Sequence, residues 1–100
     1  MNRRRTAIAQ ALAVLAPFIP AFDRAAVLDL AEDSPGLRKA SPPAAAWLAL
    51  TSHVRHLHTD YDQMRADGYD RDAARHFCAQ AMAEVLHAWG CDKRLGRNCD

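Results

Sequence analysis

The stretch that decides the expected fold spans residues 41–68 and reads SPPAAAWLALTSHVRHLHTDYDQMRADG. Ser41 can cap a helix, and proline suits the first helical position, where its missing N–H costs nothing. Gly68 suits the turn that ends a helix. Between these signals, apolar residues recur every three or four positions, at Trp47, Leu50, Val54, Leu57, Tyr61 and Met64. We therefore expect one long helix over residues 42–66 with a continuous apolar stripe.

Two shorter helices are expected ahead of the long one, over residues 6–16 and 21–32, with the arginines at positions 3–5 fraying before the first. Pro17 and Pro20 interrupt the helical pattern between them. Their apolar sides recur at helical spacing: Ile8, Leu12, Leu15 and Ile19 for the first, and Phe22, Ala26, Val27 and Leu30 for the second. A basic run before an apolar one also resembles the opening of a signal peptide. Because Gln10 and the prolines interrupt this run, we favour an amphipathic helix.

A fourth helix is expected over residues 71–89, capped by Asp70 and closed by Gly90. Its expected apolar side is Ala74, Phe77, Cys78, Ala81, Met82, Val85, Leu86 and Trp89. Because the connection to the long helix is short, the two should pair as an antiparallel hairpin. The fold class is therefore all-α, a single small four-helix domain over residues 1–90 with a flexible C-terminal tail at residues 91–100.

Composition excludes several classes of protein. Half of the 100 residues are hydrophobic and a quarter are charged, which is ordinary for a globular domain and argues against disorder. The three cysteines, at positions 78, 91 and 99, lack CxxC spacing, so we expect a reducing, cytoplasmic setting. No apolar run approaches the roughly twenty residues that span a bilayer, so no membrane contact is expected. No glycine-rich phosphate loop or nucleophile motif occurs, and no cofactor or catalytic residue is predicted.

Polar residues concentrate between His53 and Asp62, where they form two rows at helical spacing. His53, His56 and Asp60 make the first row, and two imidazoles with a carboxylate are potential metal ligands. The indication is weak, because the helical hydrolase motif places its histidines four residues apart with a glutamate between them. A solvated or hydrogen-bonded histidine face is the favoured alternative.

The second row contains Arg55, Thr59 and Asp62, with Tyr61 beside the apolar stripe. Two interpretations stay open. In the first, the row is structural and locks the hairpin. In the second, it is exposed and Arg55 grips a phosphate or a carboxylate through its planar fork of donors.

The pattern Arg-His-x-x-Thr-x-Tyr-Asp at residues 55–62 resembles the domain of unknown function family 2293, an uncharacterised family of bacteria and fungi. Gly36-Leu37-Arg38-Lys39-Ala40, residues 68–75 and residues 85–89 extend the resemblance to about residues 5 to 90. The match departs at Gln63-Met64, where leucines are expected. The resemblance implies no activity, but it indicates that the second polar row matters for folding or for function.

Three functions are weighed. The leading hypothesis is a non-enzymatic module that contacts nucleic acid through an Arg-rich face near the hairpin. Its predicted binding residues are Arg55, His56, Thr59, Tyr61, Asp62, Arg38, Lys39, Arg71 and Arg75, with Arg65 nearby. The alternative is a protein-interaction or homodimeric domain with Phe18, Phe22 and Trp89 exposed. The third is a metal-dependent hydrolase built on His53, His56 and Asp60.

Overall fold

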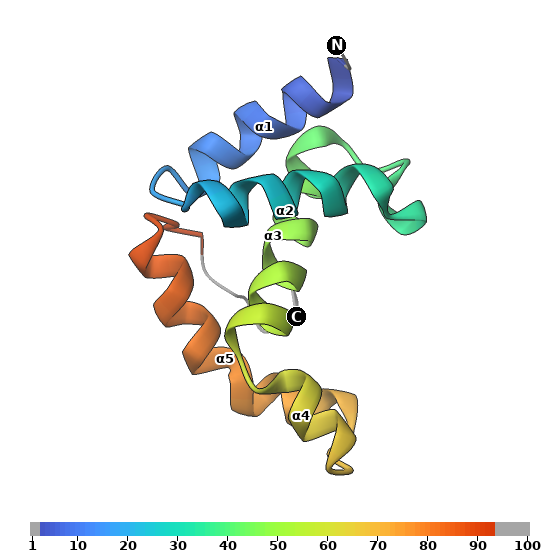
Figure 1. The fold of residues 1–100 in the computed structure, drawn as a ribbon, viewed down its shortest axis with the longest axis vertical. Coiled ribbons are helices and arrows are strands. Elements are labelled where there is room, and N and C mark those ends of the chain that lie inside the picture. The colour runs from blue at the N-terminus through green and yellow to red at the C-terminus, as the bar shows by residue number, and fades with distance from the viewer. Residues whose placement is uncertain (1–2, 94–100) are drawn as a thin grey trace.

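The computed structural model describes residues 3–93, and within that range the chain forms five α-helices, one short 3-10 helix and no strand. The elements are α1 (Arg3–Leu15), α2 (Ala21–Asp33), η1 (Pro35–Leu37), α3 (Pro42–His58), α4 (Tyr61–Ala66) and α5 (Arg71–Ala88) (Figure 1). The expected all-α fold class is confirmed. None of the helices in the described range is long and apolar enough to cross a bilayer.

The core is built around α3, which packs against α1, α2 and α5. In Figure 1, α1 and α2 lie at the upper end of α3, while α5 lies beside its lower half and runs upward from α4 toward the α1–α2 turn. The face that α3 turns to its neighbours is rich in alanine, because Ala45, Ala46 and Ala49 are fully buried. Small side chains allow neighbouring helices to approach closely, so the chain's high alanine content serves the packing as well as helix propensity. The larger core side chains are Ile8, Leu12, Val27, Leu28, Trp47, Leu50, Val54, Met82, Leu86 and Trp89.

The expected long helix over residues 42–66 is divided, because α3 ends at His58 and α4 begins at Tyr61. Thr59 adopts an extended backbone, and its hydroxyl donates a hydrogen bond to the carbonyl of Arg55 and accepts one from the N–H of Tyr61 at 3.2 Å. A threonine side chain that satisfies backbone groups in this way competes with continued helix. The periodic pattern across residues 53–64 concealed this break.

Two apolar residues predicted to be buried are exposed as a result of this arrangement. Leu57 is 62% exposed, because α3 ends one residue after it and none of the helices between residues 3 and 93 covers that side of α3. Phe77 is 59% exposed on α5 and meets the ring of Tyr69 instead of the core. Tyr61, Ala74 and Cys78 form a separate small cluster with Met64, so the hairpin at the lower end is made by α4 and the first half of α5.

The predicted helix signals are otherwise confirmed. Ser41 accepts a hydrogen bond from the N–H of Ala44 at 3.3 Å, and Asp70 accepts one from the N–H of Ala73 at 2.8 Å. Gly68 and Gly90 have φ angles of 104° and 82°, the left-handed region that favours glycine after a helix.

The arginines before the first expected helix do not fray, since α1 begins at Arg3. Arg4 Nη2 donates to the carbonyl oxygen of Leu37 at 2.7 Å. Arg5 forms ion pairs with Asp29 and Glu32 on α2, both at 3.0 Å. These contacts to distant residues hold a helix start that the macrodipole alone disfavours, because cations lie at its positive end.

The turn between α1 and α2 docks on the end of α5. The N–H of Phe18 donates to the carbonyl oxygen of Trp89 at 3.0 Å. A Cβ atom at Gly90 would lie 2.8 Å from Cδ2 of Phe18 and 2.9 Å from Cγ of Pro17. Cys91 follows and is buried, so the core includes a residue that the sequence assigned to the tail. Asp92 and Lys93 of that predicted tail are exposed, and its part from residue 94 onward lies outside the described residues.

Replacing Gly90 with alanine should destabilise the domain more than the same change at Gly68. Both positions have positive φ, so both variants carry the left-handed penalty of about 1–2 kcal/mol. Only Gly90 adds a steric conflict, because no atom of residues 3–93 lies within 4 Å of a Cβ at Gly68. Urea unfolding followed by circular dichroism measures the difference. Equal losses of stability would contradict the close docking of the α1–α2 turn on α5.

Candidate functional site

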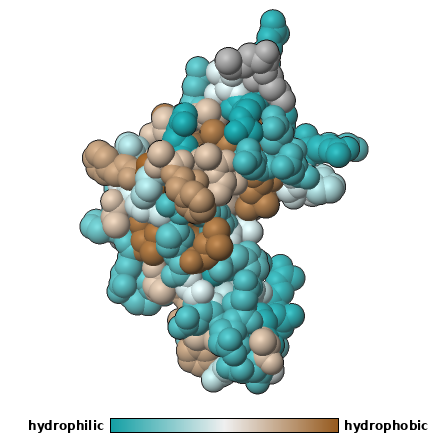
Figure 2. All heavy atoms as spheres, in the orientation of Figure 1, coloured by the Kyte–Doolittle hydropathy of each residue, from teal (hydrophilic) through white to brown (hydrophobic). Residues whose placement is uncertain are grey.

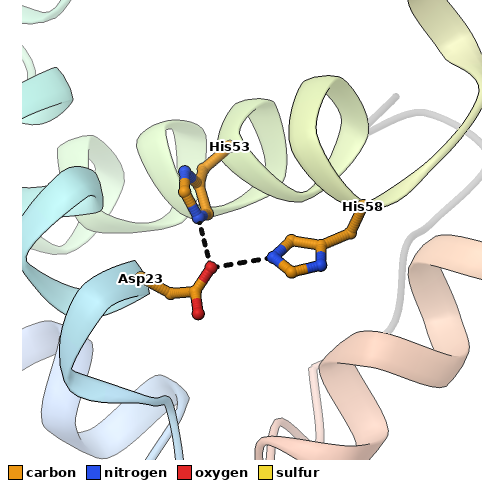
Figure 3. Close-up of side chains that lie close together, drawn as sticks. All are labelled: Asp23, His53 and His58. Atoms are coloured by element: carbon orange, nitrogen blue, oxygen red, sulfur yellow. Dashed lines mark hydrogen bonds and ion pairs between the residues drawn. The ribbon is translucent and has the colours of Figure 1, made fainter.

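Three polar side chains converge where the start of α2 meets the end of α3. The Nε2 atoms of His53 and His58 lie 2.7 Å and 2.8 Å from the same carboxylate oxygen, Oδ1 of Asp23 (Figure 3). One donor atom from each of the three residues lies within 4.8 Å of the other two. Thirty residues separate Asp23 from His53, so this cluster exists only in the folded chain.

The cluster is held in place by helix ends and by an aromatic ring. Asp23 lies in the first turn of α2, where the helix dipole favours negative charge. His58 is the last residue of α3, and its ring lies perpendicular to that of Trp89, with centroids 5.3 Å apart. The His53 ring lies 6.5 Å from that of Trp89, also centroid to centroid. Trp89, at the end of α5, therefore packs against both imidazoles and restricts their orientation.

Burial differs across the cluster. Asp23 and His53 are buried, whereas the side chain of His58 keeps 34% of its surface exposed. Burial on its own raises the pKa of the Asp23 carboxyl. The hydrogen bonds from His53 and His58, together with their positive charge when protonated, more than offset that effect, so the pKa of Asp23 lies below its ordinary value. Asp23 is therefore a carboxylate at neutral pH.

The first predicted row is not the group that the structure brings together. His53 joins Asp23 and His58, while His56 Nδ1 contacts Asp62 Oδ1 at 2.6 Å, at the start of α4. The metal set expected from the sequence, His53, His56 and Asp60, is therefore replaced by Asp23, His53 and His58. Helical spacing could not suggest this set, because residues five apart do not share a helix face and Asp23 comes from another helix.

The second predicted row surrounds the corner between α3 and α4. Thr59 makes the backbone contacts of the break, and Tyr61 is buried beneath it. The Arg55 guanidinium lies over the Tyr61 ring, 5.8 Å from its centroid, and Arg55 is only 9% exposed. Asp62 is exposed, so Arg55 and Asp62 are not buried together. In this arrangement Thr59, Tyr61 and Arg55 build the corner.

The basic residues of the predicted Arg-rich face lie at two ends of the molecule. Exposed Arg38 and Lys39 precede α3, whereas Arg71 and Arg75 begin α5, beyond its other end. The 17 residues of α3 separate the two groups by about 25 Å. Figure 1 shows the connector before α3 and the α4–α5 hairpin at opposite ends of this helix. Residues 60–76 also contain five aspartates against three arginines, so the hairpin is not a basic surface.

A protein-family model matches most of the chain and identifies its family. The family model described as uncharacterized conserved protein DUF2293 matches residues 11–90. The chain belongs to the DUF2293 family. This confirms the resemblance carried by Arg55, His56, Thr59, Tyr61 and Asp62. Neither the curated proteins nor the solved structures gave a significant match.

Replacing Thr59 with valine should cost about 1 kcal/mol of unfolding free energy, because the α3–α4 corner loses both hydroxyl hydrogen bonds. Valine keeps the β-branched shape, so the change reports on the hydroxyl. Thr59→Ser keeps the hydroxyl and serves as the matched control, with a smaller expected loss. Denaturant unfolding measures both variants. A Thr59→Val protein as stable as wild type would show that the corner does not depend on these bonds.

Proposed function

We propose that this domain acts by self-association, through an apolar surface at the corner between α1 and α2. The observation that carries the proposal is the exposure of three large apolar side chains within nine residues of sequence. Val14, Phe18 and Phe22 are 82%, 73% and 78% exposed. Two phenyl rings and a valine at these exposures leave roughly 300 Å² of apolar surface, which is the size at which a patch on a monomer is often functional.

The distribution of polarity supports the same surface. Figure 2 shows hydrophobic side chains gathered over the α1–α2 corner and the adjoining side of the molecule, while the α4–α5 end is mostly hydrophilic. Trp89, the third candidate for an exposed apolar residue, is buried beneath the corner and supports it from inside. The exposed rings therefore rest on a packed base, as the apolar centre of an interface does.

Net charge favours a second copy of the chain as the occupant. The formal net charge is +1 with histidines neutral, so two copies repel each other little. In a two-fold symmetric dimer the same patch serves both partners, and Phe18 and Phe22 of one copy would pack on those of the other. The surrounding α1 and α2 side chains would supply the polar rim, since a standard interface covers about 800 Å² on each partner.

Replacing both Phe18 and Phe22 with aspartate should weaken self-association at least tenfold, because four charges would enter the apolar centre of the dimer. Light scattering and sedimentation velocity over a concentration series measure the effect. Phe77→Asp is the matched control, because Phe77 is also exposed but lies on α5 toward the opposite end. A wild-type protein that stays monomeric at high micromolar concentration would refute the proposal.

Nucleic-acid binding is the second candidate, supported by one contact that sequence spacing does not reveal. The hydrogen bond from Arg4 to the carbonyl of Leu37 brings the N-terminal arginines next to Arg38 and Lys39. Exposed Arg3, Arg38 and Lys39 thereby gather at one end of the molecule. A phosphate backbone could meet this group, although Asp29, Glu32 and Asp33 on α2 lower the local charge.

For this second candidate, Arg38→Glu with Lys39→Glu should abolish a mobility shift of short DNA or RNA at low salt. Affinity that rests on phosphate contacts should also fall steeply as salt is added. Arg71→Glu, at the opposite end, is the control and should bind as wild type does. Absence of any shift by the wild-type protein at low salt would eliminate this function.

A further inference from the structure

We propose that Asp23, His53 and His58 form a binding site for a divalent first-row transition metal ion, zinc foremost. The proposal rests on the geometry of this cluster and is independent of self-association. Two imidazole nitrogens and one carboxylate oxygen, drawn from α2 and α3, converge on one point at the surface of the core (Figure 3). Three protein ligands leave a fourth position for water or for an added ligand.

The spacing of the donor atoms suits one ion after small adjustments. Zinc–ligand bonds of about 2.0–2.2 Å place tetrahedral donors roughly 3.3–3.5 Å apart. The two imidazole nitrogens lie 2.7 Å and 2.8 Å from the Asp23 oxygen, and all three atoms lie within 4.8 Å of one another. The carboxylate oxygen must therefore move back by about half an ångström to leave room for an ion between the three donors. Side-chain rotations of this size require no change in the helices.

The chemistry of the donors selects the class of metal. Imidazole nitrogen suits zinc, copper, nickel and iron, whereas calcium and magnesium require mostly oxygen ligands. The cluster offers two nitrogens and a single carboxylate, so the hard cations are disfavoured.

The arginine of α3, Arg55, is engaged at the α3–α4 corner. Arg55 follows His53 by two residues, which rotates it by about 200° around the helix axis. Its guanidinium lies over the ring of Tyr61, at the α3–α4 corner. This contact holds the positive charge of Arg55 at the corner. Arg24, beside Asp23 in sequence, is exposed on α2.

The surroundings of the cluster restrict the orientation of its imidazole rings and leave the side near His58 open to solvent. Trp89 contacts both imidazole rings, so their nitrogens stay aimed at Asp23 without a large entropy cost on binding. Only His58 has a substantially exposed side chain. The fourth coordination position would face solvent on that side, as in zinc sites that hold an exchangeable water.

Metal binding at this place would stabilise the fold. Asp23 lies 30 and 35 residues from the two histidines in sequence, so the complete site exists in the native chain and not in the unfolded one. A ligand that binds only the native state raises its stability in proportion to the logarithm of its concentration above Kd. An ion would therefore connect the start of α2 to the end of α3.

The test uses the full chain, purified without a histidine tag and treated with a chelator. Titration with zinc in a calorimeter should show one site per chain, and zinc should raise the melting temperature. Cobalt should give the visible absorption of a four-coordinate nitrogen and oxygen site. Trp89 packs on the ligands, so its fluorescence should change with the same stoichiometry.

Variants at position 58 test the site with the least risk to folding, because His58 is the exposed ligand. His58→Gln should weaken zinc binding by more than tenfold, the lower end of the losses seen even for outer-shell changes. His58→Cys should retain zinc, and with cobalt it should add a thiolate charge-transfer band. The control is His56→Gln, which lies on the same helix and leaves the three ligands intact.

Several results would overturn the proposal. The first is a wild-type chain that takes up no stoichiometric zinc, which would leave the cluster as a hydrogen-bonded link between α2 and α3. Equal losses from His56→Gln and His58→Gln would place the ion elsewhere. A His58→Cys protein that lacks the charge-transfer band would show that residue 58 does not touch the metal.

Discussion

The end of α3 at Thr59 is the constraint on which much of the molecule depends. Thr59 satisfies the Arg55 carbonyl and the Tyr61 N–H with one hydroxyl, and the chain changes direction there. Had the helix continued, Tyr61 and Met64 would have followed the stripe of Trp47 and Leu50 on one straight face. Instead, Tyr61 turns into a second small cluster with Ala74 and Cys78, and α4 becomes the partner of α5.

The same break determines what the histidines contact. His58 ends α3, and its imidazole reaches Asp23 on α2 although His53 and His58 are five residues apart. A residue inside a continuous helix at that spacing would point away from His53, because five positions correspond to about 140° around the axis. His56 instead meets Asp62, at the start of α4. His53 and His58 therefore contact Asp23 on α2, whereas His56 contacts Asp62, so closeness in sequence does not place the three histidines in one cluster.

Local physical chemistry made much of the fold predictable. Caps, prolines and glycines act within a few residues, so Ser41, Asp70, Gly68 and Gly90 marked helix ends correctly. The break at Thr59 was missed because a threonine hydroxyl can end a helix without interrupting its hydrophobic period. Exposure of Leu57 and Phe77 was missed for another reason, since periodicity shows which residues share a face but not whether another element covers it.

The candidate site depended on contacts that no local pattern encodes. Asp23 reads in the sequence as an ordinary acidic residue in the first turn of a helix, and it becomes distinctive only when α2 crosses the end of α3. Phe22 precedes it on the same turn and faces solvent, while Asp23 is buried against the two histidines. The first turn of α2 thus presents an apolar residue outward and a charged residue inward, the reverse of the usual order. A buried carboxylate with two imidazole partners keeps its charge compensated, so this turn can tolerate the inversion. The exposed Phe22 ring beside it is not stabilised by burial in the isolated domain. A partner surface would bury this ring.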